Sequence, residues 1–354
     1  MIISKAMIRR STQVLLVLVA IILLLLLINA LHQCQSILSL PQSLPHPLSI
    51  PLSSGQPLPE LVPRPLSIWI VETSGRSQLS PREMCSVESA ALHHPQSTIY
   101  LLLTSPILNS TLVMEMMTKY SNIQPRYLDL DTLFAGSPLS QLWLSGQVHR
   151  SRWPVSHLSD LVRYLVLYQY GGVYLDTDVI LLRPLPPNNN FVSVEYQPVN
   201  HLAAGAIKFQ PRHHVVKEIL ENLADKFSGS SWNANGPLVL EGAMRRLCES
   251  EGGGWWHGGG DKDGWVCGDV SIFREEYFYP VNWRAWETIF QSSYREEVVA
   301  AHRHSYAAHL WGHLSRQARV EWGSAGGQMA RGNCPTAAQG FMWVHGDSEG
   351  DGQV

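Results

Sequence analysis

The chain has 354 residues and carries 26 Lys and Arg against 29 Asp and Glu, which gives a formal net charge of −3. This length suits one large globular unit with appendages or, at most, two modest domains. The chain lacks the basic excess of a nucleic-acid-binding protein, so nucleic acid is not an expected partner. Only 16% of the residues are charged and 45% are hydrophobic, which excludes a disordered chain and indicates a membrane-linked or secreted protein.

The N-terminal part is an apolar run, Val14–Ile28, that follows three basic residues. This pattern predicts a transmembrane signal anchor with a cytosolic N-terminus, and a cleaved signal peptide is the alternative. Both interpretations place the remaining chain in the lumen of the secretory pathway or outside the cell. The sequence therefore divides into a cytoplasmic tail (1–10), an anchor (11–31), a Pro-rich stem (32–65), a luminal domain (66–335) and a C-terminal tail (336–354).

Four cysteines lie in the predicted luminal domain, namely Cys85, Cys248, Cys267 and Cys334. They allow three pairings, and nearness in sequence favours Cys248 with Cys267, which leaves Cys85 with Cys334. A zinc site is the weaker interpretation because the chain has no Cys-x-x-Cys pair. Asn109 begins an Asn-x-Thr sequence and is a predicted N-glycosylation site, consistent with luminal exposure.

The luminal domain begins with alternating strands and helices. Strands are predicted over 66–71, 98–103 and 126–130, with one helix capped by Ser80 and another over 108–119 between them. This order predicts an α/β fold with a mostly parallel, Rossmann-like sheet. Ligands of such sheets bind at the carboxyl ends of strands. The polar residues after the first strand, Glu72, Thr73 and Ser74, are therefore predicted to bind a nucleotide.

A long helix is predicted next, with Ser159 as its N-cap and the Gly171-Gly172 pair at its end. Asp160 and Arg163 are three residues apart, so they project from the same side of the first turn. A strand is predicted to follow over 173–182.

Two acids, Asp176 and Asp178, interrupt this otherwise apolar strand. Residues two apart on a strand point to the same face, so we expect their carboxylates side by side. Such a pair needs a cation, because unpaired buried carboxylates are strongly destabilising. Oxygen ligands with open positions suit Mg²⁺ or Mn²⁺ bridging a diphosphate.

These motifs resemble the α1,4-galactosyltransferase family of DxD glycosyltransferases, the family of globotriaosylceramide synthase. The resemblance covers roughly 66–335 and is carried by seven short runs: Ile70–Ser74, Met84–Ala90, Tyr174–Asp178, Gly236-Pro237, Phe278–Pro280, Tyr306–Trp311 and Cys334-Pro335. It implies a GT-A nucleotide-sugar-binding fold in the luminal domain, a Mn²⁺-dependent UDP-sugar donor and transfer with retention of the α-anomer. It also implies a type II membrane protein of the Golgi with its catalytic domain in the lumen.

The resemblance assigns roles to individual residues. Asp178 would bind Mn²⁺ directly, and Asp176 would approach the ribose and a metal-bound water. His309 is predicted as a further metal ligand, with an ordinary packed or solvent-facing histidine as the alternative. Five residues are expected around the donor sugar: Asp160, Arg163, Tyr174, Gly236 and Trp311.

The implied activity moves galactose from UDP-galactose to a terminal galactoside of a glycolipid such as lactosylceramide. Transfer of GalNAc or GlcNAc is one alternative. A sugar-nucleotide-binding relative without turnover is another, because the chain departs from the family twice: Ala203–Ala206 precedes Phe209 where relatives carry an Asn, and Gly312 follows Trp311 where an Asn is expected. A Ca²⁺-dependent lectin is disfavoured, because two acids are too few for the 6 to 8 oxygens that Ca²⁺ takes.

Overall fold

The computed structural model describes residues 50–51, 66–196, 201–253 and 263–344. The predicted cytoplasmic tail and anchor, nearly all of the stem and the end of the C-terminal tail lie outside these residues. Among the described residues, no helix is long and apolar enough to cross a membrane.

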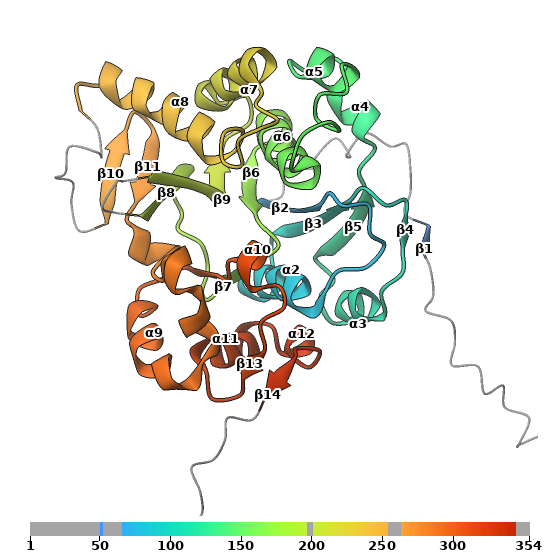
Figure 1. The fold of residues 1–354 in the computed structure, drawn as a ribbon, viewed down its shortest axis with the longest axis vertical. Helices are drawn as coiled ribbons and strands as arrows, with labels where there is room; N and C mark the ends of the chain where they lie inside the picture. The colour runs from blue at the N-terminus through green and yellow to red at the C-terminus, as the bar shows by residue number, and fades with distance from the viewer. Residues whose placement is uncertain (1–49, 52–65, 197–200, 254–262, 345–354) are drawn as a thin grey trace, which may run out of the picture. The chain divides into compact units, whose positions relative to one another are not determined.

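One sheet of eight strands, in the order β10-β11-β8-β9-β6-β2-β3-β5, forms the centre of the folded unit (Figure 1). Strands β6, β2, β3 and β5 run parallel to one another, as predicted. On the other side of β6 the sheet is mixed, because β9 is antiparallel to both β6 and β8. The strands are β2 (Ser67–Glu72), β3 (Thr98–Leu103), β5 (Ile123–Tyr127), β6 (Gly172–Leu175), β8 (Asn190–Tyr196), β9 (His201–Phe209), β10 (Gly264–Cys267) and β11 (Val270–Phe273).

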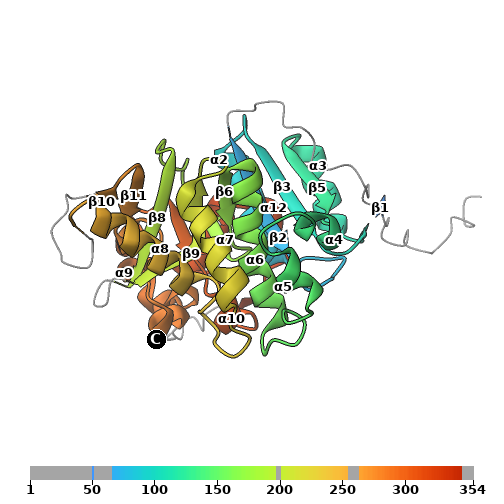
Figure 2. The ribbon, with the colours of Figure 1, turned by 90° about the horizontal axis from the view of Figure 1, so that it is seen from above.

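Helices cover both faces of this sheet (Figure 1). One layer, which Figure 2 views from above, contains α4 (Leu130–Phe134), α5 (Ser140–Leu144), α6 (Pro154–Tyr170), α7 (His214–Lys226) and α8 (Pro237–Ser250). The opposite layer contains α2 (Pro81–His93), α3 (Thr111–Lys119), α9 (Arg295–Ala301), α11 (Ala325–Asn333) and α12 (Pro335–Ala338). Two apolar cores result, one on each face, and β6 contributes to both through alternate side chains such as Val173 and Tyr174.

The remaining elements are short. Strand β7 (Val179–Leu181) pairs with β12 (Ala307–His309), β1 (Ile50–Pro51) with β4 (Ile107–Leu108), and β13 (Val320–Glu321) with β14 (Trp343–Val344). The others are α10 (Gly312–Ser315) and the 3₁₀ helices η3 (Glu275–Tyr277), η4 (Trp283–Phe290) and η5 (Ser292–Tyr294).

Several predicted boundaries are wrong, each for a local reason. The third strand covers 123–127 instead of 126–130, since Pro125 is tolerated on this edge strand. The helix predicted from 108 begins at Thr111, because Ile107–Leu108 pairs with β1. The helix predicted from Ser159 begins at Pro154, and proline suits the first helical position. Asp160 and Arg163 therefore lie beyond the first turn.

Two disulfides link elements of the folded unit. Cys85 on α2 pairs with Cys334 between α11 and α12, and Cys248 on α8 pairs with Cys267 on β10. This is the pairing that sequence spacing favours. Beside the first bridge, the buried Glu88 carboxylate accepts hydrogen bonds from the backbone N–H groups of Thr336 and Ala337.

Candidate functional site

The two acids of the Asp-x-Asp motif lie in a turn and not on a continuous strand. The strand predicted over 173–182 stops at Leu175 and resumes at Val179, so the expectation that strand geometry aligns Asp176 with Asp178 is wrong. The Asp176 N–H donates to the carbonyl of Gly205 on β9 at 2.8 Å, and the Val179 N–H donates back to the Asp176 carbonyl at 3.2 Å. The turn, and not the alternation of side chains along a strand, brings both carboxylates to the carboxyl end of β6.

Asp178 meets a segment from the far end of the chain. Pairing of β7 with β12 places His309 opposite Val179, with its Nε2 3.3 Å from Asp178 Oδ1. The Gly312 N–H donates to Asp178 Oδ2 at 2.6 Å. Asp176, Asp178 and His309 each offer an atom to a group whose members all lie within 4.8 Å of one another.

The hydrogen bonds of His309 define its tautomer. The Trp311 N–H donates to Nδ1 at 3.2 Å, so Nδ1 carries the lone pair and Nε2 carries the proton that faces Asp178. In this state His309 orients the Asp178 carboxylate. Direct ligation through Nε2 requires the proton to move to Nδ1 and the Trp311 contact to break.

Arg163 is the centre of a buried ion cluster. Its Nη2 lies 3.0 Å from Asp160 Oδ1 and 3.3 Å from Asp176 Oδ1, and its Nη1 donates to the Ala204 carbonyl at 2.7 Å. Burial raises the pKa of Asp160, and the Arg163 guanidinium opposes that rise. The predicted pair on α6 is thus tied directly to the Asp-x-Asp turn.

Tyr174 links this cluster to the helix. Its hydroxyl donates to Asp176 Oδ1 at 2.8 Å, so the contact with Ser159 Oγ, also 2.8 Å, has serine as the donor. Arg163 lies over the tyrosine ring, 4.6 Å from its centroid. Ser159 therefore donates a hydrogen bond to Tyr174 and does not cap the helix.

Gly236 packs directly on Asp160. A Cβ at this position would lie 2.9 Å from Asp160 Cγ, closer than real contacts allow. Its carbonyl accepts the Tyr164 hydroxyl at 2.7 Å. The structure places Gly236 at the start of α8 and in contact with the cluster.

The predicted nucleotide loop lies at the carboxyl end of β2, next to β6. The Ser74 N–H donates to Glu72 Oε1 at 2.9 Å, and the Thr73 hydroxyl donates to the Val155 carbonyl at the start of α6, 2.8 Å away. Trp311, predicted near the sugar, packs its ring 4.3 Å from that of His309, and its indole N–H donates to the Val281 carbonyl.

Unpaired buried polar atoms lie in this region. Among the described residues, six buried side-chain atoms lack a hydrogen-bond partner, and three of them belong to Glu72, Arg163 and Tyr279. Buried polar atoms are nearly always paired in folded proteins. A polar ligand with a divalent cation fits this arrangement, because the turn acids offer hard oxygen ligands and Arg163 and Tyr279 offer N–H and O–H donors.

Tyr279 is a residue near the turn that sequence reasoning did not assign. Tyr279 belongs to the Phe278–Pro280 run that carries the resemblance, but no pattern in the sequence brings it next to Asp176. Its place beside the turn depends on contacts between distant segments.

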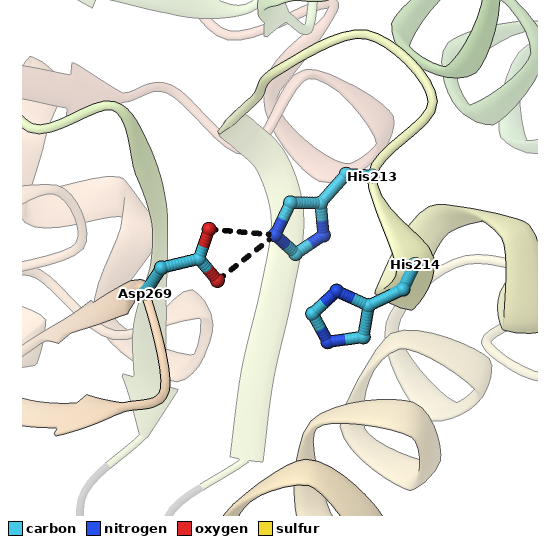
Figure 3. A group of neighbouring side chains, drawn as sticks. All are labelled: His213, His214 and Asp269. Atoms are coloured by element: carbon cyan, nitrogen blue, oxygen red, sulfur yellow. Dashed lines mark hydrogen bonds and ion pairs between the residues drawn. The ribbon is translucent and has the colours of Figure 1, made fainter.

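A second cluster, His213, His214 and Asp269, has the composition of a metal site (Figure 3). However, the Val215 N–H donates to His213 Nδ1 at the start of α7, which leaves the proton on Nε2. That nitrogen faces Asp269 Oδ1 at 3.1 Å, and burial lowers the pKa of His213. His213 thus acts as a helix cap tied to Asp269, and its protonated Nε2 offers no lone pair to a metal.

Asn109 is half-buried near the start of α3, and its N–H donates to the Ser77 carbonyl at 2.8 Å. Its glycosylation stays a prediction.

Two regions of the chain match models of glycosyltransferases. Residues 80–196 match the glycosyltransferase sugar-binding region containing a DXD motif, and residues 208–340 match the alpha 1,4-glycosyltransferase conserved region. Lactosylceramide 4-alpha-galactosyltransferase of Rattus norvegicus is 29% identical over 275 residues, 76% of this chain and 74% of the relative. Alpha-1,4-N-acetylglucosaminyltransferase of Homo sapiens is 28% identical over 259 residues, 71% of this chain and 72% of the relative.

Likeness to solved structures is weaker. The PaToxG glycosyltransferase has a TM-score of 0.40 and 17% identity over 51% of this chain and 68% of its own. The galactosyltransferase LgtC, in complex with donor and acceptor sugar analogues, has a TM-score of 0.36 and 11% identity over 69% of this chain and 86% of its own. Both matched regions of the sequence converge on the Asp-x-Asp turn, which lies in the first region while His309 and Gly236 lie in the second. The chain therefore carries a glycosyltransferase sugar-binding region containing a DXD motif, followed by an alpha 1,4-glycosyltransferase conserved region.

Proposed function

We propose that this protein is a retaining, metal-dependent α1,4-glycosyltransferase of the GT-A type that moves galactose from UDP-galactose to a terminal galactoside of a glycolipid such as lactosylceramide. The convergence of Asp160 and Arg163 with the acids of the 176–178 turn carries the proposal. The match to lactosylceramide 4-alpha-galactosyltransferases over 76% of the chain supports the choice of sugar and acceptor.

The carboxylates of Asp176 and Asp178 would hold the metal, for which we propose Mn²⁺, with His309 as the further ligand from the same group. When bound, the cation supplies charge stabilisation for the departing diphosphate. The loop of Glu72, Thr73 and Ser74 binds the nucleotide. Tyr174, Gly236 and Trp311 complete the surroundings of the donor.

Asp160 and Arg163 orient the donor sugar. Both Asp160 and Asp176 are tied to Arg163, within 3.0 and 3.3 Å of its Nη2, so neither carboxylate is free to attack the anomeric carbon. We therefore favour attack by the acceptor hydroxyl from the face of the leaving group. Attack on this face keeps the α-configuration, and the proton of the acceptor hydroxyl passes to the departing phosphate.

We also propose that the enzyme is a type II membrane protein of the Golgi with its folded domain in the lumen. The two disulfides support an oxidising compartment. The apolar run Val14–Ile28 supplies the anchor.

The test uses membranes from cells that express the full chain, with lactosylceramide and UDP-galactose, UDP-GalNAc or UDP-GlcNAc in parallel, with and without chelator. We expect chelator-sensitive transfer of galactose, and digestion with a linkage-specific α-galactosidase checks the bond formed. The Asp178→Asn variant should lose about 100-fold or more of this activity, since a carboxylate ligand to the cation is removed. The matched control is Asp225→Asn, at an exposed position on α7.

Transfer of GlcNAc is the second candidate, because the human alpha-1,4-N-acetylglucosaminyltransferase matches 71% of the chain. The same assay separates the two by the donor that is consumed. Binding of a UDP-sugar without transfer or hydrolysis would contradict both and identify a relative without turnover. Chelator-sensitive transfer that persists in Asp178→Asn would contradict the assigned metal site.

A further inference from the structure

Trp232 is a partly exposed residue in the loop that joins α7 to α8, residues 227–236. It is 40% exposed, although its ring contacts two others. The Trp153 ring lies edge to face with it at 5.7 Å between centroids, and the His313 ring lies at 4.5 Å. These three residues, here called the aromatic cluster, come from the start of α6, the α7–α8 loop and α10. Tryptophan that stays partly in water is typical of surfaces that bind a partner.

Hydrogen bonds hold the loop in a fixed shape. The buried Asn235 side chain accepts the Ser228 N–H at 2.9 Å and donates to the Ser228 carbonyl at 2.8 Å, which ties the two ends of the loop together. Next to Trp232, the Ser231 carbonyl accepts Nε2–H of the buried His157 at 3.1 Å. The ring is therefore positioned before a ligand binds, and such preorganisation lowers the cost of binding.

Two segments of the aromatic cluster join the donor site directly. His313 follows Gly312, whose N–H donates to Asp178 Oδ2 at 2.6 Å. The α7–α8 loop ends at Gly236, which packs on Asp160. The cluster thus borders the donor site beside the groups assigned to the metal and to the transferred sugar.

Exposure separates the aromatic cluster from the groups that hold the donor sugar. Asp160 and Arg163 are each 6% exposed, whereas Trp232 is 40% exposed. A sugar held by the buried pair has its outer side toward solvent, and the second substrate must approach from there. A ring that lies on Trp232 is therefore part of the acceptor.

The chemistry of the aromatic cluster fits a pyranose. The face of an indole is negative, and it attracts the positively polarised C–H groups on one face of a sugar ring. The hydroxyl groups at the edge of that ring need polar partners. The exposed residues Ser230, Asn233 and His313 lie in the same segments and carry hydroxyl, amide and imidazole groups. A hydrocarbon chain would use the indole and leave these polar groups without a role.

We propose that the aromatic cluster is the acceptor subsite, in which the terminal galactose of the acceptor stacks its C–H face on Trp232. This inference rests on the proposed function and names the residue that recognises the second substrate. Trp153 and His313 support the Trp232 ring from two sides. Because the contact is made with the sugar, acceptors with and without the lipid part use it alike.

The experiment compares wild type with Trp232→Ala, Trp232→Phe and Trp232→Leu in the detergent-solubilised full chain. Transfer assays measure KM for lactosylceramide and for a soluble lactoside without lipid, and calorimetry measures the Kd for UDP-galactose with Mn²⁺. Trp232→Ala should raise both acceptor KM values about 10-fold and leave the donor Kd unchanged. Trp232→Phe should recover most of this loss and Trp232→Leu little of it, because leucine has no aromatic face.

Trp322→Ala is the matched control. Trp322 is 48% exposed, and its ring also lies edge to face with another tryptophan, Trp343, at 5.1 Å. It follows β13, among the C-terminal elements, and belongs to none of the three segments of the aromatic cluster. Both acceptor KM values of this variant should equal those of wild type.

Four results would overturn the inference. Unchanged acceptor KM values in Trp232→Ala would show that the ring does not contact the acceptor. A rise in KM for lactosylceramide alone would assign the aromatic cluster to the lipid part. A weaker Kd for UDP-galactose would assign Trp232 to the donor. Equal KM values for Trp232→Leu and Trp232→Phe would show that apolar area and not stacking decides the effect.

A binding measurement separates this inference from the proposed function. Calorimetric titration of the lactoside into protein loaded with UDP and Mn²⁺ measures acceptor binding without turnover. Wild type that binds the lactoside about 10-fold more tightly than Trp232→Ala but transfers no galactose would contradict the proposed function and support the acceptor subsite. Wild type that does not bind the lactoside would overturn the subsite.

Discussion

Three glycines shape the site as closely as its charged residues do. Gly205, Gly236 and Gly312 each leave room that a Cβ would take from Asp176, Asp160 or Asp178. At Gly312, one of the two departures from the family pattern, the backbone N–H itself binds Asp178. A Cβ there would lie 3.0 Å from Asp178 Oδ2. That departure therefore leaves Asp178 with a partner that needs no side chain.

Gly236→Ala should impair the donor site without unfolding the protein. The added methyl group overlaps the Asp160 carboxylate, so either Asp160 or the start of α8 must shift, at about 1–3 kcal/mol of overpacking. We expect KM for the donor to rise about tenfold or more, by the geometric sensitivity of such sites. Steady-state kinetics with varied UDP-galactose measures this.

Gly242→Ala on the same helix is its control. A Cβ at Gly242 meets only the Arg246 side chain, at 3.6 Å or beyond. Alanine at a free helical position stabilises by about 0.5–1 kcal/mol relative to glycine, so this variant should keep its KM and gain stability. Equal KM values for the two variants would contradict the packing of Gly236 on Asp160.

At the scale of elements, the local sequence pattern predicts the strands and helices but not every interruption within a strand. Strand 98–103 and the Ser80 cap, which accepts the N–H of Glu83, are as predicted because short-range signals decide them. The break at 176–178 was not predictable, since apolar residues flank it on both sides. It is fixed by Gly205 on β9 and by the β12 partner of β7. The donor-side pair on α6 was predictable because helical spacing alone brings Asp160 to Arg163.

His94 makes stability depend on pH. Its Nε2 accepts the Leu185 N–H at 3.0 Å, and burial, then His93 and Lys208, lower its pKa from 6.5 to about 4. Between these values the unfolded chain takes up the proton first, so this contribution to stability is present above pH 6.5 and is lost as the pH falls toward 4. Below pH 4 the effect of His94 on the unfolding free energy no longer changes with pH.

Urea unfolding of wild type and His94→Gln at several pH values measures this effect. Glutamine can accept the Leu185 N–H and does not titrate. Relative to His94→Gln, wild type should lose unfolding free energy as the pH falls from 6.5 to 4. Parallel curves would show that His94 titrates normally.

Glu88 stabilises the last helix. Its buried carboxylate accepts the N–H groups of Thr336 and Ala337 and the Tyr120 hydroxyl. Glu88→Gln turns an amide toward these donors and should cost about 1.5–3 kcal/mol, the range for hydrogen bonds to a charged group. Urea unfolding measures it, with the exposed Glu115→Gln on α3 as control. A loss no larger than that of the control would contradict the capping role.

At the scale of the whole molecule, the site lies where the sheet changes from parallel to mixed strand pairing. Strand β6 pairs in parallel with β2 and antiparallel with β9, and the Asp-x-Asp turn leaves its carboxyl end. The parallel half could be predicted from alternating strands and helices, and the location of a site at strand ends follows from it. Tyr279 and Gly205 reach the site only through the mixed half, whose order no local pattern encodes.

The two disulfides should differ in what they contribute. Cys85–Cys334 closes a separation of 249 residues and Cys248–Cys267 one of 19. Chain-entropy arguments give about 5 kcal/mol for the first and about 3 for the second. Replacing Cys85 and Cys334 with alanine should therefore lower the urea midpoint more than replacing Cys248 and Cys267. The reverse order would show that native packing and not loop closure decides the effect.

The pairing of β7 with β12 also bears on the order in which the parts of the protein are synthesised and can fold. All eight strands of the main sheet lie before residue 274, whereas His309, Gly312 and Cys334 come later. When synthesis has reached the end of β11, the partners of Asp178 and the second half of the long bridge have not yet been made. The main sheet can thus form before the residues that contact Asp178 have been synthesised. A protein that ends after β11 would be inactive.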